Sequence, residues 1–265
     1  MPLTLATWNI NSVRLRLPQI ARLLQERPID VLCLQETKVS DEKFPRAELA
    51  ALGLRHQVIH GAKGHHGVAI CSRIPLEDAG RRLFHDHDGP RHVAARIDGI
   101  TLHNYYVPAG GDVPDPAVND KFAHKLGYLD GMTGWYDPAS GEAHGDMILV
   151  GDLNVAPGEH DVWSHKALLD VVSHTPVETG KLETLRTTLD WIDVARHYRP
   201  DPEKLYTWWS YRARDWAESD RGRRLDHIWT TQSLGPALRG FEILRQVRGW
   251  ERPSDHVPVL TTLSL

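Results

Sequence analysis

Short polar motifs adjoin three apolar segments that lie far apart in the chain. The motifs are Gln35–Thr37, Gly151–Asn154 and Ser254–His256. Each borders a segment with the composition of a buried strand, and sheets present functional side chains at strand ends. Carboxylate, amide and imidazole groups that converge on one rim suit a hard divalent cation and phosphate chemistry. The sequence therefore predicts metal-assisted chemistry on a phosphoester at a strand-end rim.

The elements that must position these motifs are mostly strands. The near-continuous apolar run Val31–Gln35 is typical of a strand buried on both faces. A helix is expected over Gln19–Gln25, because Pro18 suits its first turn. Two more helices are expected near Asp120–Leu129 and Leu182–Leu189. The other expected strands are Leu3–Trp8, Gln57–His60, Val68–Ser72, Val93–Ile97, Thr101–Val107, Met147–Val150, Leu225–Thr230 and Val257–Leu263.

This order of elements favours an α+β fold. Strand-to-strand steps mix with strand-to-helix steps, so two packed sheets flanked by helices fit better than a regular doubly wound sheet. No Gly/Ser linker or low-complexity stretch divides the 265 residues, and we expect one domain over residues 1–265.

Composition indicates an ordinary globular protein, with 41% hydrophobic and 25% charged residues. The net charge of −4 gives no global attraction to nucleic acid, so a DNA-handling protein would need local positive charge. Cys33 and Cys71 lie in apolar runs and are expected to be reduced, buried thiols of a cytoplasmic protein. We expect no signal peptide, because Met1–Leu5 lacks a basic region followed by an apolar stretch, and no membrane segment, since no apolar run approaches about 18 residues.

The three motifs belong to a longer series that spans nearly the whole chain. The series is Trp8–Asn11, Leu34–Lys38, Lys63–Ala69, Asn104–Pro108, Gly151–Asn154, Arg224–Asp226 and Pro253–His256. In content and order it resembles the exonuclease III family of the endonuclease/exonuclease/phosphatase superfamily. The resemblance implies a four-layered α/β sandwich with two mostly antiparallel sheets. It also implies divalent-metal-dependent hydrolysis of DNA phosphodiesters.

The resemblance further implies the ligands of a Mg²⁺ or Mn²⁺ ion. Glu36 would supply a carboxylate and Asn9 an amide oxygen, and hard oxygen ligands suit these ions. Asp255 is a third candidate, because the family places its Ser-Asp-His motif on the same rim. Asp152 and Asn154 complete the expected metal-contacting set.

Catalytic roles follow from the same resemblance. Asp152 resembles the residue that deprotonates the attacking water, and Asn154 would donate to a phosphoryl oxygen. His256 resembles the imidazole that contacts the scissile phosphate, with Asp226 fixing its orientation and favouring its charged form. The alternative that His256 itself is the base stays open. Tyr106 matches a family tyrosine that contacts the phosphate.

Substrate contacts are expected mainly from the second half of the chain, where Tyr206–Arg214 interleaves aromatic residues with arginines. Aromatic faces stack on bases, and arginines pair with phosphates. By resemblance Trp208, Trp209 and Leu225 would line the pocket for a base-free sugar, although only one of two adjacent strand residues can face a given side. The other expected DNA contacts are Arg14, Lys63, His65, Lys121, Lys125, His174, Arg212 and Arg223.

Two segments depart from the family pattern. After Asn154, many relatives carry an Asn- or Lys-rich stretch where this chain has a bulky His174. That residue could restrict access of a flipped abasic sugar and favour 3′-end processing over incision at internal abasic sites. Ala109 lacks a polar side chain for DNA contact. The 16 histidines do not form a spaced structural zinc site, and we expect Phe84–Asp88 to be a solvated loop.

The favoured hypothesis is a monomeric DNA repair hydrolase. Its partners would be duplex DNA with abasic sites or with blocked or recessed 3′ ends, cleaved by abasic-site endonuclease and 3′→5′ exonuclease or 3′-trimming activity. Two alternatives stay open: a phosphoesterase acting on an inositol phosphate or phospholipid, and a DNA-binding relative without catalysis.

Overall fold

The computed structural model describes residues 2–86 and 88–265, and two six-stranded sheets dominate it. Each sheet has one parallel pair, β1–β2 in the first and β7–β8 in the second, and all its other pairs are antiparallel. The first sheet has the order β13 (Leu238–Ile243), β14 (Val259–Ser264), β1 (Pro2–Asn9), β2 (Val31–Gln35), β4 (Val68–Ser72), β3 (His56–His60). The second has the order β5 (Glu77–Gly80), β6 (His92–Ile97), β7 (Ile100–Tyr106), β8 (Met147–Asp152), β12 (Asp226–Thr230), β9 (Ile192–Asp193).

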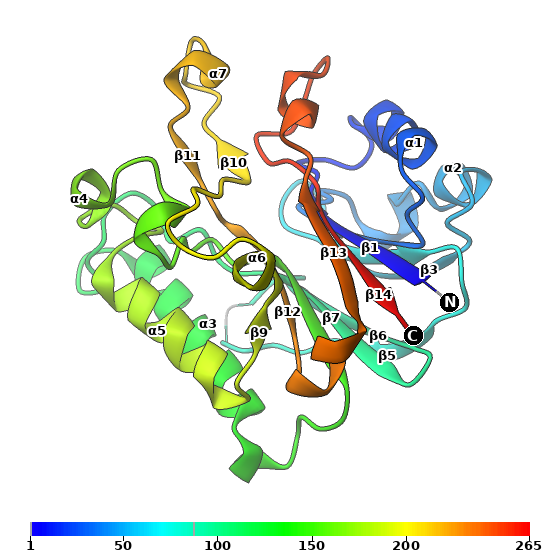
Figure 1. The fold of residues 1–265 in the computed structure, drawn as a ribbon, viewed down its shortest axis with the longest axis horizontal. Coiled ribbons are helices and arrows are strands. Elements are labelled where there is room, and N and C mark those ends of the chain that lie inside the picture. Colours follow the sequence, from blue (N-terminus) through cyan, green and yellow to red (C-terminus); the bar gives the residue numbers. More distant parts are fainter. Residues whose placement is uncertain (1, 87) are drawn as a thin grey trace.

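Helices cover the outer faces of both sheets (Figure 1). The α-helices are α1 (Leu17–Glu26), α2 (Arg46–Ala51), α3 (Asp120–Tyr136), α4 (His165–Leu168), α5 (Pro176–Thr188), α6 (Val194–Tyr198) and α7 (Trp216–Ser219). Short 3₁₀ turns occur at Asp41–Lys43, Pro138–Ser140, Glu159–Asp161, Gln232–Ala237 and Arg245–Gly249. With α1 and α2 on one side and α3 and α5 on the other, the layers are helix, sheet, sheet, helix, as the expected four-layered α+β sandwich requires.

Strand β1 illustrates how side-chain alternation builds these layers. Leu3 and Leu5 belong to the core between the two sheets, whereas Ala6 and Trp8 belong to the core under the helices. Successive side chains of a strand point to opposite faces, so an apolar strand serves both cores at once. The expected strands of the two sheets are confirmed, and Val31–Gln35 and Val68–Ser72 have the expected bounds.

Beyond the sheets, residues 208–223 form a projection that we call the rim arm (Figure 1). It consists of β10 (Trp208–Trp209), α7 and β11 (Gly222–Arg223), and β10 pairs with β11. None of the described helices is long and apolar enough to cross a membrane. Cys33 and Cys71 are buried free thiols, as expected.

The segment Phe84–Asp88 has no helix or strand in its described residues and Asp86 is exposed, but Phe84, His85 and Asp88 are half-buried, so the expected solvated loop is wrong for these three; His87 lies outside the described residues. The Phe84 ring is half-buried and packs against Tyr105 and Tyr128. The Asp88 carboxylate accepts the backbone N–H groups of Phe84 and His85, at 2.7 and 2.9 Å. Aromatic packing and these hydrogen bonds hold the segment against α3, although its charged residues suggested solvent.

Candidate active site

Strand register brings the polar motifs together at one rim. Across the second sheet Asp152 pairs with Tyr106 on one side and with Asp226 on the other. In the first sheet Asn9 pairs with Gln35, which precedes Glu36. Strands β1, β2, β7 and β8 therefore end at this rim, and β12 begins there.

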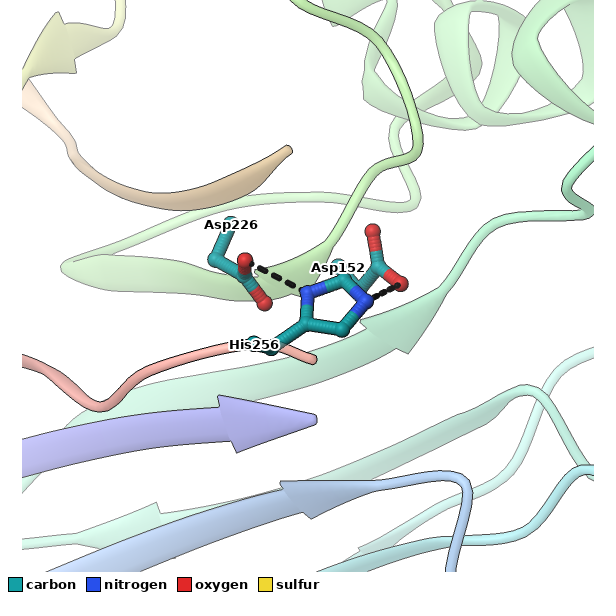
Figure 2. A group of neighbouring side chains, drawn as sticks. All are labelled: Asp152, Asp226 and His256. Carbon is teal, nitrogen blue, oxygen red and sulfur yellow. Dashed lines mark hydrogen bonds and ion pairs between the residues drawn. The ribbon is translucent and has the colours of Figure 1, made fainter. Parts of the chain in front are cut away.

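His256 lies between two buried carboxylates (Figure 2). Its Nδ1 atom lies 2.8 Å from Oδ2 of Asp226, and its Nε2 atom lies 3.6 Å from Oδ2 of Asp152. The Thr207 hydroxyl donates to the same Asp226 oxygen at 2.6 Å and accepts the N–H of Leu225 at 3.0 Å. Asp226 therefore orients the imidazole, as the resemblance implied.

Electrostatics favour a charged His256. Burial opposes that charge, but Asp226 and then Asp152 outweigh burial and raise the pKa of His256 to about 10. Burial is also the main cause that raises the pKa of Asp152 to about 7, and the adjacent His256 opposes the rise. A carboxylate with a raised pKa accepts a proton more readily than an ordinary aspartate, which suits the role of a base.

Asn9 joins the remaining carboxylate to this group. Its Nδ2 atom donates to Glu36 and to Asp152, each at 2.9 Å. Glu36 is held in the left-handed backbone region, with φ of 50°, and its carboxylate also pairs with Lys38 at 2.8 Å. Burial raises the pKa of Glu36, but Lys38 and Asn9 together outweigh it and lower the pKa below its usual value.

The donor atoms present here fit a hard divalent cation. Carboxylate oxygens of Asp152 and Asp226 lie within 4.8 Å of each other and of His256, whose charged imidazole is not itself a metal ligand. Oδ1 of Asp226 is buried without a hydrogen-bond partner, so an acceptor there is unsatisfied. The carboxylates of Glu36 and Asp152 flank one amide group and add oxygen donors.

Asp255 and Asn9 already have protein partners in this structure. The Asp255 oxygens accept from Asn11 at 3.1 Å and from the Trp208 indole at 3.0 Å. Lys38 donates a hydrogen bond to the Asn11 side chain and also pairs with Glu36. Asp255 is therefore linked to Glu36 through Asn11 and Lys38. The Asn9 amide oxygen accepts the N–H of Asn11 at 3.1 Å. Ligation by Asn9 or Asp255 stays a prediction.

Tyr106 and Asn154 complete the buried part of the site. Burial, reinforced by Glu36 and Asp152, raises the pKa of Tyr106 well above its ordinary value, so the phenol remains a neutral donor. Asn154 donates from Nδ2 to Asp152 Oδ2 at 3.2 Å and to the carbonyl of Val107 at 2.8 Å.

The structure separates the two adjacent tryptophans of the rim arm. Trp208 is half-buried beside Leu225, with Arg223 stacked 5.3 Å from its ring. Trp209 is 1% exposed and belongs to the core under α1 and α2, so its expected place in the sugar pocket is wrong. Alternation along β10 explains the difference.

The expected phosphate-gripping residues are mostly exposed on segments that follow rim-ending strands. Arg14 follows β1, Lys63 and His65 lie between β3 and β4, and Lys121 follows β7. Arg212 is exposed on the rim arm. Lys125 is the exception: it is fully buried and paired with Glu178, so its expected DNA contact is wrong.

His174 is 2% exposed and lies on the segment that Arg223 grips. Its Nδ1 atom lies 2.6 Å from the carbonyl of Ala156, and its Nε2 atom 2.8 Å from Nδ1 of His165. Arg223 reaches the hydroxyl of Ser173 at 2.7 Å. The bulky ring is therefore fixed on a segment that Arg223 contacts, and Arg223 in turn stacks on Trp208.

Sequence reasoning missed Arg91 and Thr207. Arg91 is buried, stacks 4.9 Å from the Tyr106 ring and donates to the Tyr106 carbonyl. Its position in sequence, just before β6, carries no signal that separates it from other arginines. Thr207 could have been suspected, because it directly precedes the aromatic pair at the rim.

Comparisons with known proteins agree with this geometry. A model of the Endonuclease/Exonuclease/phosphatase family matches residues 6–256. Exodeoxyribonuclease III of Haemophilus influenzae is 28% identical over 268 residues, covering 96% of this chain and 97% of that protein. An AP endonuclease from Archaeoglobus fulgidus superposes with a TM-score of 0.91 at 32% identity, covering 99% of this chain and all of that one. The 3′ phosphatase NExo from Neisseria, bound to a product DNA hairpin, has a TM-score of 0.89 at 32% identity, with 99% and 100% coverage.

Proposed function

Because this chain belongs to the endonuclease/exonuclease/phosphatase family, we propose that it is a divalent-metal-dependent DNA hydrolase of base-excision repair. Its relatives are named as an exodeoxyribonuclease, an AP endonuclease and a 3′ phosphatase. All three activities can be carried out by attack of water on a phosphorus atom that is bonded to a 3′ oxygen. One active site therefore suffices for all of them.

The observation that carries the proposal is the position of His256 between Asp226 and Asp152, with Glu36 joined through Asn9. Asp152 takes a proton from the attacking water, and the water oxygen bonds to phosphorus as the bond to the 3′ oxygen breaks; the 3′ oxygen leaves as a hydroxyl after taking a proton from solvent water. The charged His256 and the neutral donors of Asn154 and Tyr106 stabilise the phosphoryl oxygens.

Mg²⁺ or Mn²⁺ is the proposed cofactor, held by Glu36 with Asn9, Asp255, Asp152 and Asn154 as further candidate contacts. When bound, the cation supplies positive charge against the negative charge that develops in the transition state. The chain's own residues then orient the water and the phosphate around that charge.

The proposed substrate is duplex DNA, and 3′-end processing is the proposed main activity. Arg14, Lys63, Lys121 and Arg212 supply exposed positive charge around the rim, a local concentration that the overall net charge of −4 does not reveal. His174 lies on the segment that Arg223 contacts, and Arg223 stacks on Trp208, so we propose that the bulk of His174 limits the room for a flipped abasic sugar there. A single-domain monomer in the cytoplasm is the remaining part of the proposal.

The test is one panel of end-labelled duplexes. They carry an internal abasic analogue, a 3′ phosphate at a nick or a recessed 3′ end, each with Mg²⁺, Mn²⁺ or chelator. We expect metal-dependent turnover, fastest on the 3′ phosphate or recessed end. Cleavage of a soluble inositol phosphate without turnover of any DNA would overturn the proposal, and metal-independent DNA binding without turnover would do the same.

A further inference from the structure

Lys125 of α3 is a fully buried charge that lies directly behind the rim. Its ammonium group donates to the carbonyl of Asn154 at 2.7 Å and makes a longer contact of 3.4 Å with the carbonyl of Ala109. It also pairs with the Glu178 carboxylate, whose side chain is likewise fully buried. One ammonium group therefore ties the segment after β8 to the segment after β7.

Glu178 extends this link to a third segment. Its two carboxylate oxygens accept the N–H of Ser173 at 2.9 Å, and one accepts the Thr175 hydroxyl at 2.7 Å. These residues flank His174. Three segments therefore meet at the Lys125–Glu178 ion pair. They are the segment that follows Tyr106, the segment that contains Asn154 and the segment that contains His174.

The link to Asn154 has a direct consequence for Asp152. Asn154 adopts φ of 53°, a left-handed region that is uncommon for non-glycine residues, although asparagine adopts it more readily than most. Its own N–H donates to Asp152 Oδ1 at 2.9 Å, and its side-chain amide donates to Oδ2. An anchored Asn154 carbonyl therefore helps to fix two of the hydrogen bonds that orient the Asp152 carboxylate, and Asn9 donates the third.

We infer that Lys125, neutralised by Glu178, is a positioning residue that holds Asn154 in its left-handed conformation and thereby orients Asp152 for the reaction. A buried ion pair is a weak way to stabilise a fold, because desolvation of both charges costs as much as the pairing returns. An apolar replacement of the pair would lose the hydrogen bond that the Lys125 ammonium group donates to the Asn154 carbonyl. The inference rests on the proposed function.

The test compares three forms of the full chain: wild type, Lys125→Met/Glu178→Gln and the control Leu49→Ala. The double variant removes both charges, so neither is left buried alone, and Glu178→Gln keeps one of the two oxygens that accept from Ser173 and Thr175. Lys125→Met alone is measured beside it. We expect kcat on the best DNA substrate to fall about 10- to 100-fold in the double variant, with KM nearly unchanged, because misplaced reacting groups cost rate rather than binding.

Leu49→Ala removes a buried side chain on α2, on the opposite outer face of the molecule. It should lower thermal stability and leave kcat unchanged. The second readout is the NMR signal of the Asn154 side-chain amide, which should shift or broaden in the double variant and not in Leu49→Ala. Unchanged kcat together with an unchanged Asn154 signal would overturn the inference. If wild type cleaves no DNA, the proposed function fails, and the Asn154 signal alone still decides the role of Lys125.

Discussion

Nδ1 of His256 lies 2.8 Å from Oδ2 of Asp226, and both side chains are buried. The pair couples an imidazole from the end of the chain to a strand of the opposite sheet. Asp226 is held in turn by the Thr207 hydroxyl, so its carboxylate cannot turn away. Asp226 and Asp152 thus favour a charged imidazole through contacts that the protein itself provides.

This relationship predicts a displaced histidine titration. With a folded pKa of about 10, against 6.5 ordinarily, the charge of His256 contributes stability that is fully present below about pH 6.5. That contribution is lost as the pH rises through about 10. Asp226→Asn removes the main partner and should lower the pKa of His256. NMR titration of the imidazole signals measures it, with buried His227 as the internal control; an unchanged His256 titration would contradict the assignment.

Asp152→Asn should remove the base while preserving shape. We expect kcat to fall by about 10²- to 10⁴-fold, the usual contribution of a positioned base. Binding of the duplex and the melting temperature should stay near wild type, because the amide is isosteric with the carboxyl group. Turnover at the wild-type rate in this variant would show that another group takes the proton.

Removal of the Glu36 carboxylate should weaken metal binding directly. Calorimetric titration of the chelator-treated protein with Mn²⁺ should give an affinity at least about tenfold lower for Glu36→Gln, because a charged oxygen ligand is lost. Asp255→Asn tested in the same way decides whether Asp255 is a ligand. Asp130→Asn, a change on the exposed surface of α3, is the matched control. Equal affinities in all four proteins would remove Glu36 from the ligand set.

A second buried ion pair predicts the response of stability to acid. Arg224 donates to both oxygens of Asp161, at 2.7 and 2.9 Å, and also reaches Asp193. Burial raises the pKa of Asp161, but Arg224 outweighs it and lowers the value from 3.8 to about 2. The depressed pKa means that the pair stabilises the fold above about pH 4 and loses that effect as the pH falls through 2.

Asp161→Asn should therefore cost about 3–5 kcal/mol at pH 7, because it leaves the Arg224 charge buried without its main partner. Urea unfolding of both proteins at pH 7, 4 and 2.5 measures the difference. The gap between wild type and variant should narrow toward the lowest pH. A gap that stays constant with pH would show that the carboxylate charge of Asp161 does not matter.

The sequence predicted most of the framework because its strands have a strong local signal. Val31–Gln35 is apolar except for Gln35 and lies in the middle of a sheet. Strand β13 was missed, since Leu238–Ile243 contains Gly240 at a register shift and only one fully buried residue. Edge strand β5 was also missed, because Glu77–Gly80 is largely exposed and polar and therefore lacks the apolar signal of a buried strand.

At the site, local pattern predicted which residues matter but not how they face. Lys125 could have been placed correctly, because Phe122 and Leu129 lie three and four residues away on the same buried helical face. The prediction of a DNA contact gave more weight to the positive charge of Lys125 than to this apolar pattern. The sequence showed that Trp208 and Trp209 must face opposite sides, but not which of them faces the pocket. That choice depends on the pairing of β10 with Gly222 and Arg223, which is set by distant segments. Arg91 acts only through tertiary contact with Tyr106, which sequence spacing does not encode.

The ring of His174 should set the ratio between 3′-end processing and abasic-site incision. It is locked by the Ala156 carbonyl and by His165, next to a segment gripped by Arg223. His174→Ser removes most of the ring volume, so the incision rate on an internal abasic analogue should rise relative to 3′-phosphate removal by the same preparation. His165→Ala is the matched control, since it removes the hydrogen bond but leaves the ring of His174 in place. If both variants keep the wild-type ratio, the bulk of His174 does not limit access of the sugar, and the preference must be set elsewhere on the rim.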